Sequence, residues 1–174
     1  MAQTQAALPF KIGDPVVHPA QGAGTINDVT TFERGGEPRE YYTIELIDDS
    51  GTLMVPTDSA DDIGLRRARY GVDQIQEQLL NDPEDLPDHY RTRHADIRRK
   101  LKSGSPMQVA EAVRDLAWRE HVHELTKVDN DLLKEGSEML VGEIAAKRGI
   151  QLRAATRHLN KMIGEAISRH DTRH

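Results

Sequence analysis

Short apolar runs separated by turn residues occupy the chain from Phe10 to Leu65. The runs cover residues 16–17, 25–26, 41–47 and 52–55. Glycines and aspartates that suit tight hairpin turns stand between the runs, at residues 13–14, 22–24, 35–36 and 48–51. These turns lie so close together that no segment between them is long enough for a helix that could cover a sheet. We therefore predict four or five antiparallel strands that curl into a small β-barrel.

Beyond Gly64 the apolar residues recur at helical spacing. Val72, Ile75 and Leu79 define the first stripe, which is broken at residues 86–87. Further helices are predicted over residues 90–101, from residue 106 behind an N-cap at Ser105, over residues 125–149 and over residues 152–168. The second half of the chain is therefore expected to be all-helical, with four or five helices.

The predicted fold class is α+β with more than one domain. A small antiparallel β-barrel is expected over residues 10–66 and a helical domain over residues 70–168. Residues 1–9 have no apolar period and are predicted to form a disordered leader, and residues 169–174 a polar tail. The boundary between the domains is expected near residues 64–70, where the apolar period changes.

Charge is distributed unevenly along the chain. The formal net charge is -6, which argues against a protein that coats nucleic acid indiscriminately. Residues 1–80 hold six Lys/Arg and 13 Asp/Glu, whereas residues 81–174 hold 17 and 16. Within residues 91–102, six basic residues accompany one acid, Asp96. This segment creates a local positive field of the kind that attracts phosphates, although a merely solvated helix face would carry the same run.

No motif indicates catalysis, a metal or a cofactor. Cysteine is absent, and His121 and His123 are two residues apart, so a helix would point them to different sides. The glycines at residues 22–24 lie between short strands and do not open a helix, as a dinucleotide loop would. No stretch is long and apolar enough for a membrane span, and the N-terminus lacks a signal pattern. We expect a cytoplasmic, non-enzymatic protein without cofactor.

Two motif blocks resemble the CarD/CdnL family, whose first domain is shared with the transcription-repair coupling factor. The first block comprises residues 10–19 (FKIGDPVVHP), 21–24 (QGAG), 41–44 (YYTI), 52–56 (TLMVP) and 64–66 (GLR). The second comprises residues 101–104 (LKSG) and 109–116 (VAEAVRDL). The blocks fall in family order, and the resemblance runs from Phe10 to about Ile144.

The resemblance implies a bacterial transcription regulator with a Tudor-like N-terminal domain that binds the RNA polymerase β subunit. It also implies a helical domain that contacts promoter DNA at the upstream edge of the bubble and so stabilises the open complex. An exposed edge strand near residues 52–55 would suit such a contact, because it can pair with another sheet. Packing in the barrel core explains Leu53 and Val55 equally well. The predicted polymerase-binding residues are Phe32, Arg34, Glu37, Met54, Val55 and Pro56.

The helix that faces DNA departs from the family pattern at one position. Relatives usually carry a tryptophan 14 residues before the glycine of the turn that is Ser103-Gly104 in this chain. In those relatives the tryptophan inserts into the minor groove. Here that residue is Tyr90, a smaller ring that can still stack or insert. A purely structural packing role for Tyr90 is the alternative. The residues predicted to bind DNA are Tyr90, Arg91, Arg93, Lys100 and Arg114.

Two features lie outside the family pattern. Phe32 and Met54 replace arginines that some relatives use against polymerase, which predicts a more apolar contact. The sequence beyond Gly149 exceeds the usual family length and is interpreted as an added helix, with basic residues that provide an auxiliary DNA contact. The expected partners are the RNA polymerase β subunit and promoter DNA, and the protein is expected to be monomeric. A protein–protein adaptor that does not touch DNA is the alternative function, and an enzyme is a distant third.

Overall fold

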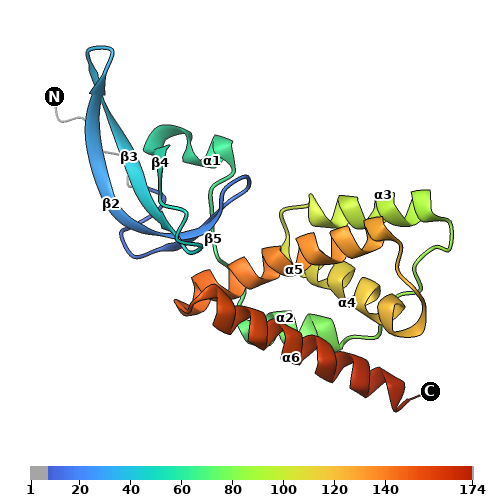
Figure 1. The fold of residues 1–174 in the computed structure, drawn as a ribbon. Coiled ribbons are helices and arrows are strands. Elements are labelled where there is room, and N and C mark those ends of the chain that lie inside the picture. Colours follow the sequence, from blue (N-terminus) through green and yellow to red (C-terminus); the bar gives the residue numbers. More distant parts are fainter. Residues whose placement is uncertain (1–7, 174) are drawn as a thin grey trace. The chain divides into compact units, whose positions relative to one another are not determined.

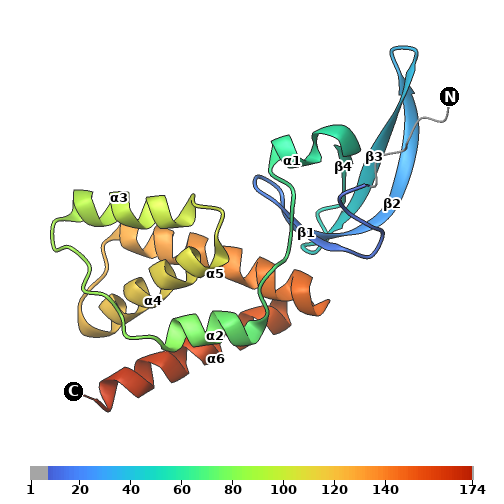
Figure 2. The ribbon, with the colours of Figure 1, turned by 180° about the vertical axis from the view of Figure 1, so that it is seen from behind.

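The computed structural model describes residues 8–173, except for the side chain of Arg34. The described chain forms two compact units, one ending at Ala68 and one beginning at Arg69 (Figures 1 and 2). The first unit is built from strands and the second from helices. The predicted fold class, a β unit followed by an all-helical unit, is confirmed.

The β unit is a five-stranded antiparallel sheet. Its strands are β1 (Pro15–His18), β2 (Gly22–Arg34), β3 (Glu37–Leu46), β4 (Thr52–Pro56) and β5 (Arg66–Arg67). Their order is β4-β3-β2-β1-β5, so β4 and β5 are the two edges and the sheet does not close into a complete barrel. The register of β2 and β3 shifts at a bulge between Ile26 and Asp28. Strand β2 is curved (Figure 1). The 3-10 turn η1 (Thr57–Ser59) and helix α1 (Ala60–Ile63) lead from β4 towards β5.

One apolar cluster holds the β unit together. Its buried members are Phe10, Val16, Ile26, Tyr42, Ile44, Val55, Ala60 and Leu65. The Phe10 and Tyr42 rings meet edge to face at 5.6 Å, and the Phe10 amide donates a hydrogen bond to the Tyr42 hydroxyl. Leu8 packs against the same cluster. Two residues of the predicted leader, Leu8 and Pro9, therefore belong to the folded unit, and residues 1–7 lie outside the described part.

Gly24 allows β2 and β3 to approach closely. A Cβ atom at this position would lie 2.5 Å from the backbone oxygen of Glu45 and 2.6 Å from the Ile44 Cγ2 atom. We predict that Gly24→Ala lowers the free energy of unfolding of the β unit by about 1–3 kcal/mol through overpacking. Chemical denaturation of the full chain measures this change. Gly13→Ala, where the space is open but φ is positive, is a control that introduces backbone strain without a clash.

The helical unit is organised around its central helix α4 (Pro106–Val122). Helices α2 (Val72–Leu80), α3 (Tyr90–Leu101), α5 (Lys127–Arg148) and α6 (Leu152–Asp171) all pack against it. Pro106 is the first residue of α4, as predicted, although the Ser105 side chain makes no cap hydrogen bond. Gly149 ends α5 with a left-handed conformation near the predicted end, and Thr126, which was not predicted as a cap, accepts the Asp129 amide at the start of α5.

The last helix continues past its predicted end. We expected α6 to end near Ser168 and residues 169–174 to form a polar tail, but the helix runs to Asp171 and His170 is buried. The His170 ring lies 2.9 Å from the Asn81 carbonyl oxygen, and it meets the Trp118 ring edge to face. Packing of this histidine against α2 and α4 extends the helix. No described helix is long and apolar enough to cross a membrane.

Candidate functional site

Tyr90 is the first residue of α3 and lies on the surface. Its relative exposure is 49%, so the ring is not enclosed in the helical core. The ring stacks on His89 at 5.4 Å and meets His94 at 5.8 Å. The Arg91 guanidinium lies 5.7 Å from the ring centroid, and its Nε donates to the Tyr90 hydroxyl at 3.1 Å. The result is an exposed aromatic group with an adjacent cation.

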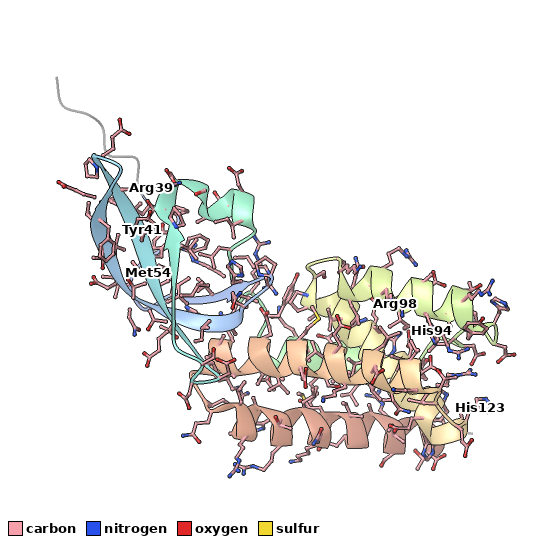
Figure 3. The ribbon with its side chains drawn as sticks, turned by 45° about the horizontal axis from the view of Figure 1, so that its top comes forward. Arg39, Tyr41, Met54, His94, Arg98 and His123 are labelled. Atoms are coloured by element: carbon pink, nitrogen blue, oxygen red, sulfur yellow. The ribbon has the colours of Figure 1, made fainter. Side chains whose placement is uncertain are left out.

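A stripe of exposed cations begins at Arg91, beside Tyr90, and runs along α3 on a different side of the helix from the tyrosine. Arg91, Arg98 and Lys102 are exposed at positions i, i+7 and i+11, which places them on one side of the helix (Figure 3 labels Arg98). The intervening member of this row is the exposed, small Ala95. No carboxylate of the described residues pairs with these three cations. Our prediction of specific DNA-binding residues omitted Arg98 and Lys102, although their spacing from Arg91 was visible in the sequence.

Arg93 is buried, which contradicts its predicted role as a phosphate contact. Its side chain forms a two-pronged ion pair with Asp129, with both nitrogen–oxygen distances at 2.9 Å. The remaining nitrogen donates to the carbonyl oxygens of Pro87 and Asp88 at 2.8 Å. Arg93 therefore ties the loop before Tyr90 to the start of α5. Its side chain is therefore not on the surface where the prediction placed it.

Asp129 is kept ionised inside the helical unit. Burial raises the pKa of this carboxyl, but hydrogen bonds from Arg93 and Thr126 outweigh burial and hold the pKa well below its usual range. The His94 Nε2 atom lies 3.1 Å from the same carboxylate. The pKa of Arg93 is raised in turn, chiefly by the hydrogen bond to Asp129.

Lys100 and Arg114 also face acids within the protein. The Lys100 ammonium lies 3.3 Å from Asp115 and 3.4 Å from Glu111, and the Arg114 guanidinium lies 2.8 Å from Asp115. Asp115 is buried and also accepts the amide of Glu84 at 3.0 Å. Both cations are paired with acids in this cluster, so neither is the unpaired surface cation that we expected. For Lys100, sequence spacing cannot reveal such pairing, because Asp115 and Glu111 come from another helix; Arg114 pairs with its neighbour in the sequence.

Strand β4 presents a free edge. It pairs only with β3, and Leu46 donates its amide to the Gly51 oxygen at 3.0 Å just before the strand begins. Because hydrogen-bonded pairs alternate along antiparallel strands, Leu53 and Val55 direct their backbone groups to β3. Thr52 and Met54 therefore direct theirs outward. The edge expected near residues 52–55 is present.

The sheet face beside this edge carries exposed apolar side chains. Phe32 is 45% exposed and Met54 is 42% exposed, and the Phe32 ring meets Tyr41 edge to face at 6.0 Å. The strand register places all three on one face, and Figure 3 shows Arg39, Tyr41 and Met54 on β3 and β4. Arg39 pairs with Asp58 at 2.8 Å beside the apolar residues.

The other predicted polymerase-binding residues occupy different positions. The Val55 side chain is buried in the core on the opposite face, which contradicts its predicted contact and supports the packing alternative. Pro56 ends β4 and is partly exposed. Glu37 is exposed at the β2–β3 turn, opposite Arg34, whose side chain lies outside the described part. Gly35 and Gly36 form this two-residue turn with positive φ at both positions.

Comparison with known proteins identifies both units. Residues 10–69 match the family "CarD-like/TRCF RID domain", and residues 74–160 match the family "CarD, C-terminal domain". The chain belongs to the CarD/CdnL family of transcription regulators. RID domains interact with RNA polymerase, so the first match supports RNA polymerase as a partner of this CarD-like chain. A similar protein from Bacillus subtilis (strain 168) is named "Putative transcription factor YdeB". It is 27% identical over 143 residues, which cover 81% of this chain and 94% of the relative.

The CarD family match extends further than the motif blocks indicated. It reaches residue 160, inside α6, whereas the resemblance in sequence ended near Ile144. The first part of α6 therefore belongs to the CarD C-terminal domain and is not an addition to it. The CarD family is in general non-enzymatic. Among the described residues, no group of three histidine or acidic side chains could hold a metal ion.

Proposed function

We propose that this chain binds the β subunit of RNA polymerase through its β unit and stabilises the promoter open complex through its helical unit. The observation that carries the proposal is the surface of α3, where an exposed aromatic ring is followed by an unpaired cationic stripe. The family match to an RNA polymerase-interacting domain supports the proposed polymerase contact of the β unit. One chain thus carries a polymerase contact and a DNA contact.

The polymerase contact is formed by β4 and the face beside it. A strand of the β subunit pairs with the outward backbone groups of Thr52 and Met54, which extends the sheet. The exposed Phe32 and Met54 side chains flank this pairing and provide apolar contact area. An edge strand gives affinity through its main chain, and the side chains at its rim give specificity.

The DNA contact is formed by the exposed face of α3. Tyr90 stacks against or inserts between bases at the upstream edge of the bubble, where unstacking is least costly. Arg91, Arg98 and Lys102 contact phosphates; α3 rises about 1.5 Å per residue, so the row spans about 16 Å. About three phosphates lie within reach, so binding to free DNA is weak and sensitive to salt. Arg93 and Asp129 hold the loop that presents the ring.

Substitution at the β4 edge tests the polymerase contact. We predict that Met54→Pro weakens binding of the full chain to RNA polymerase at least tenfold, because proline removes the outward amide and leaves the pairing with β3 in place. Met54→Ala, which keeps the amide, should weaken binding less. Binding is measured with purified polymerase by biolayer interferometry.

Met139→Ala is the control for Met54→Ala, because it removes an equally exposed methionine side chain from the helical unit. Met139→Ala should bind polymerase as the unchanged protein does. Equal binding by Met54→Pro and the unchanged chain would reject the edge contact. If Met54→Pro binds polymerase as the unchanged chain does, and the protein also has no effect on open-complex lifetime, the adaptor function is favoured instead.

A further inference from the structure

A second cationic surface surrounds the turn between α5 and α6. Residues 144–164 contain no aspartate or glutamate, and their five basic residues are Lys147, Arg148, Arg153, Arg157 and Lys161. In a chain with a net charge of -6, an acid-free segment of 21 residues with five cations is a strong local departure. This surface is separate from the α3 stripe described above.

All five cations are exposed at this end of the helical unit. Gly149 ends α5 and Gln151 immediately precedes α6, so the end of one helix is adjacent to the start of the other. Arg153, Arg157 and Lys161 recur at every fourth position of α6, about 6 Å apart along its axis. Lys161 lies 3.9 Å from Glu165, and no described carboxylate pairs with the other four cations.

Helix stability does not explain the arginines at the start of α6. Lys147 and Arg148 end α5, where cations interact favourably with the helix dipole. Arg153 lies in the first turn of α6, where a cation is unfavourable, and that turn contains no acid and no side-chain cap. A charge arrangement that opposes helix stability is typical of a surface with another role.

The surface has the composition of a nucleic-acid contact. Its row on α6 is flanked by the polar or small residues Thr156, Asn160 and Gly164, and none of the exposed large hydrophobic side chains of the described residues lies on α6. Protein interfaces have an apolar centre, whereas DNA interfaces are polar and strongly positive. Phosphates are therefore the favoured ligand, and acidic protein segments are less so.

The position of α6 makes this contact distinct from the one at Tyr90. Helix α3 packs on α4 and α5, and α6 packs on α2, α4 and α5, so the two cationic helices lie on opposite sides of the helical unit (Figures 1 and 2). We propose that the start of α6 and the end of α5 bind the phosphate backbone of duplex DNA without sequence preference, as a second DNA-binding surface. The helical unit can then hold duplex DNA on one side while α3 contacts the bubble on the other.

Binding of the full chain to a blunt 20-base-pair duplex tests this surface independently of the polymerase and of Tyr90. Fluorescence anisotropy is measured between 50 and 200 mM salt for the unchanged chain and for the double variant Arg153→Gln/Arg157→Gln. Each lost phosphate contact lowers the salt slope by about 0.9, so the unchanged chain should lose about tenfold more affinity over this range than the variant. Lys134→Gln, at an exposed cation that pairs with Glu138 on α5, is the matched control and should keep the full slope.

Thermal unfolding distinguishes a binding effect from a folding effect. Because Arg153 opposes the α6 dipole, the double variant should unfold at an unchanged or slightly higher temperature while binding duplex more weakly. Equal salt slopes for the unchanged chain and the variant would reject the second surface. Binding of polyglutamate in place of duplex, with the same dependence on the two arginines, would also reject it. The proposed open-complex function would survive either result, because it depends on α3.

Discussion

Asp129→Ala should lower the free energy of unfolding of the helical unit by about 3–5 kcal/mol, because removing one partner of a buried ion pair leaves an uncompensated charge. Arg93 and Asp129 are both almost inaccessible to solvent, and their pairing joins α3 to α5. The substitution also removes the cap interaction with the Thr126 amide. Trp118 lies in α4 and is the single tryptophan, so its fluorescence during urea unfolding reports on this unit.

An exposed ion pair on the same helix provides the control for this effect. Lys134 and Glu138 lie 3.9 Å apart with side chains 77% and 69% exposed. Glu138→Ala should change the free energy of unfolding by less than about 0.5 kcal/mol. Equal losses for Asp129→Ala and Glu138→Ala would show that the buried pair contributes nothing beyond a surface pair.

The same carboxylate makes the stability of the helical unit sensitive to acid. The pKa of Asp129 is lower in the folded chain than in the unfolded chain, whose aspartates titrate near about 4. The unfolded state therefore binds a proton first, and the contribution of Asp129 is full above that pH and decreases as the pH falls below it. Asp129→Asn should flatten the acid branch of the stability profile, which urea unfolding between pH 2 and pH 6 measures.

Tyr90→Ala should shorten the lifetime of promoter open complexes about tenfold. Stacking of a base on an aromatic ring contributes about 1–3 kcal/mol, and alanine removes the ring entirely. The stability of the fold should change little, since half of the ring is already exposed. The lifetime is measured from the decay of heparin-resistant complexes formed by purified polymerase and the full chain.

Two variants make this result specific to the ring of residue 90. Tyr90→Trp offers more apolar area and should keep or lengthen the lifetime. Met139→Ala removes a similarly exposed side chain from α5 and should leave it unchanged. A lifetime for Tyr90→Ala equal to that of the unchanged protein, with polymerase still bound, would remove Tyr90 from the mechanism and leave the polymerase contact intact.

The sequence by itself determined the larger divisions of this protein. Three predicted signals act locally: the change from strand runs to helical spacing near Gly64, the glycines at residues 35–36 and the helix start at Pro106. They specify turns and helix ends before any packing forms. The count of charges also identified residues 91–102, with six basic residues and one acid, as a basic segment. The turn and helix signals depend on backbone geometry within a few residues.

Only the tertiary structure decided which of those charges face solvent. Arg93 is neutralised by Asp129, 36 residues away, and Lys100 by Asp115, 15 residues away, whereas Arg98 and Lys102 remain exposed. A helical period gives the angle between side chains, but it does not tell which side a distant helix will cover. The buried end of α6 at His170 has the same origin, because its partners lie on α4 and beside α2.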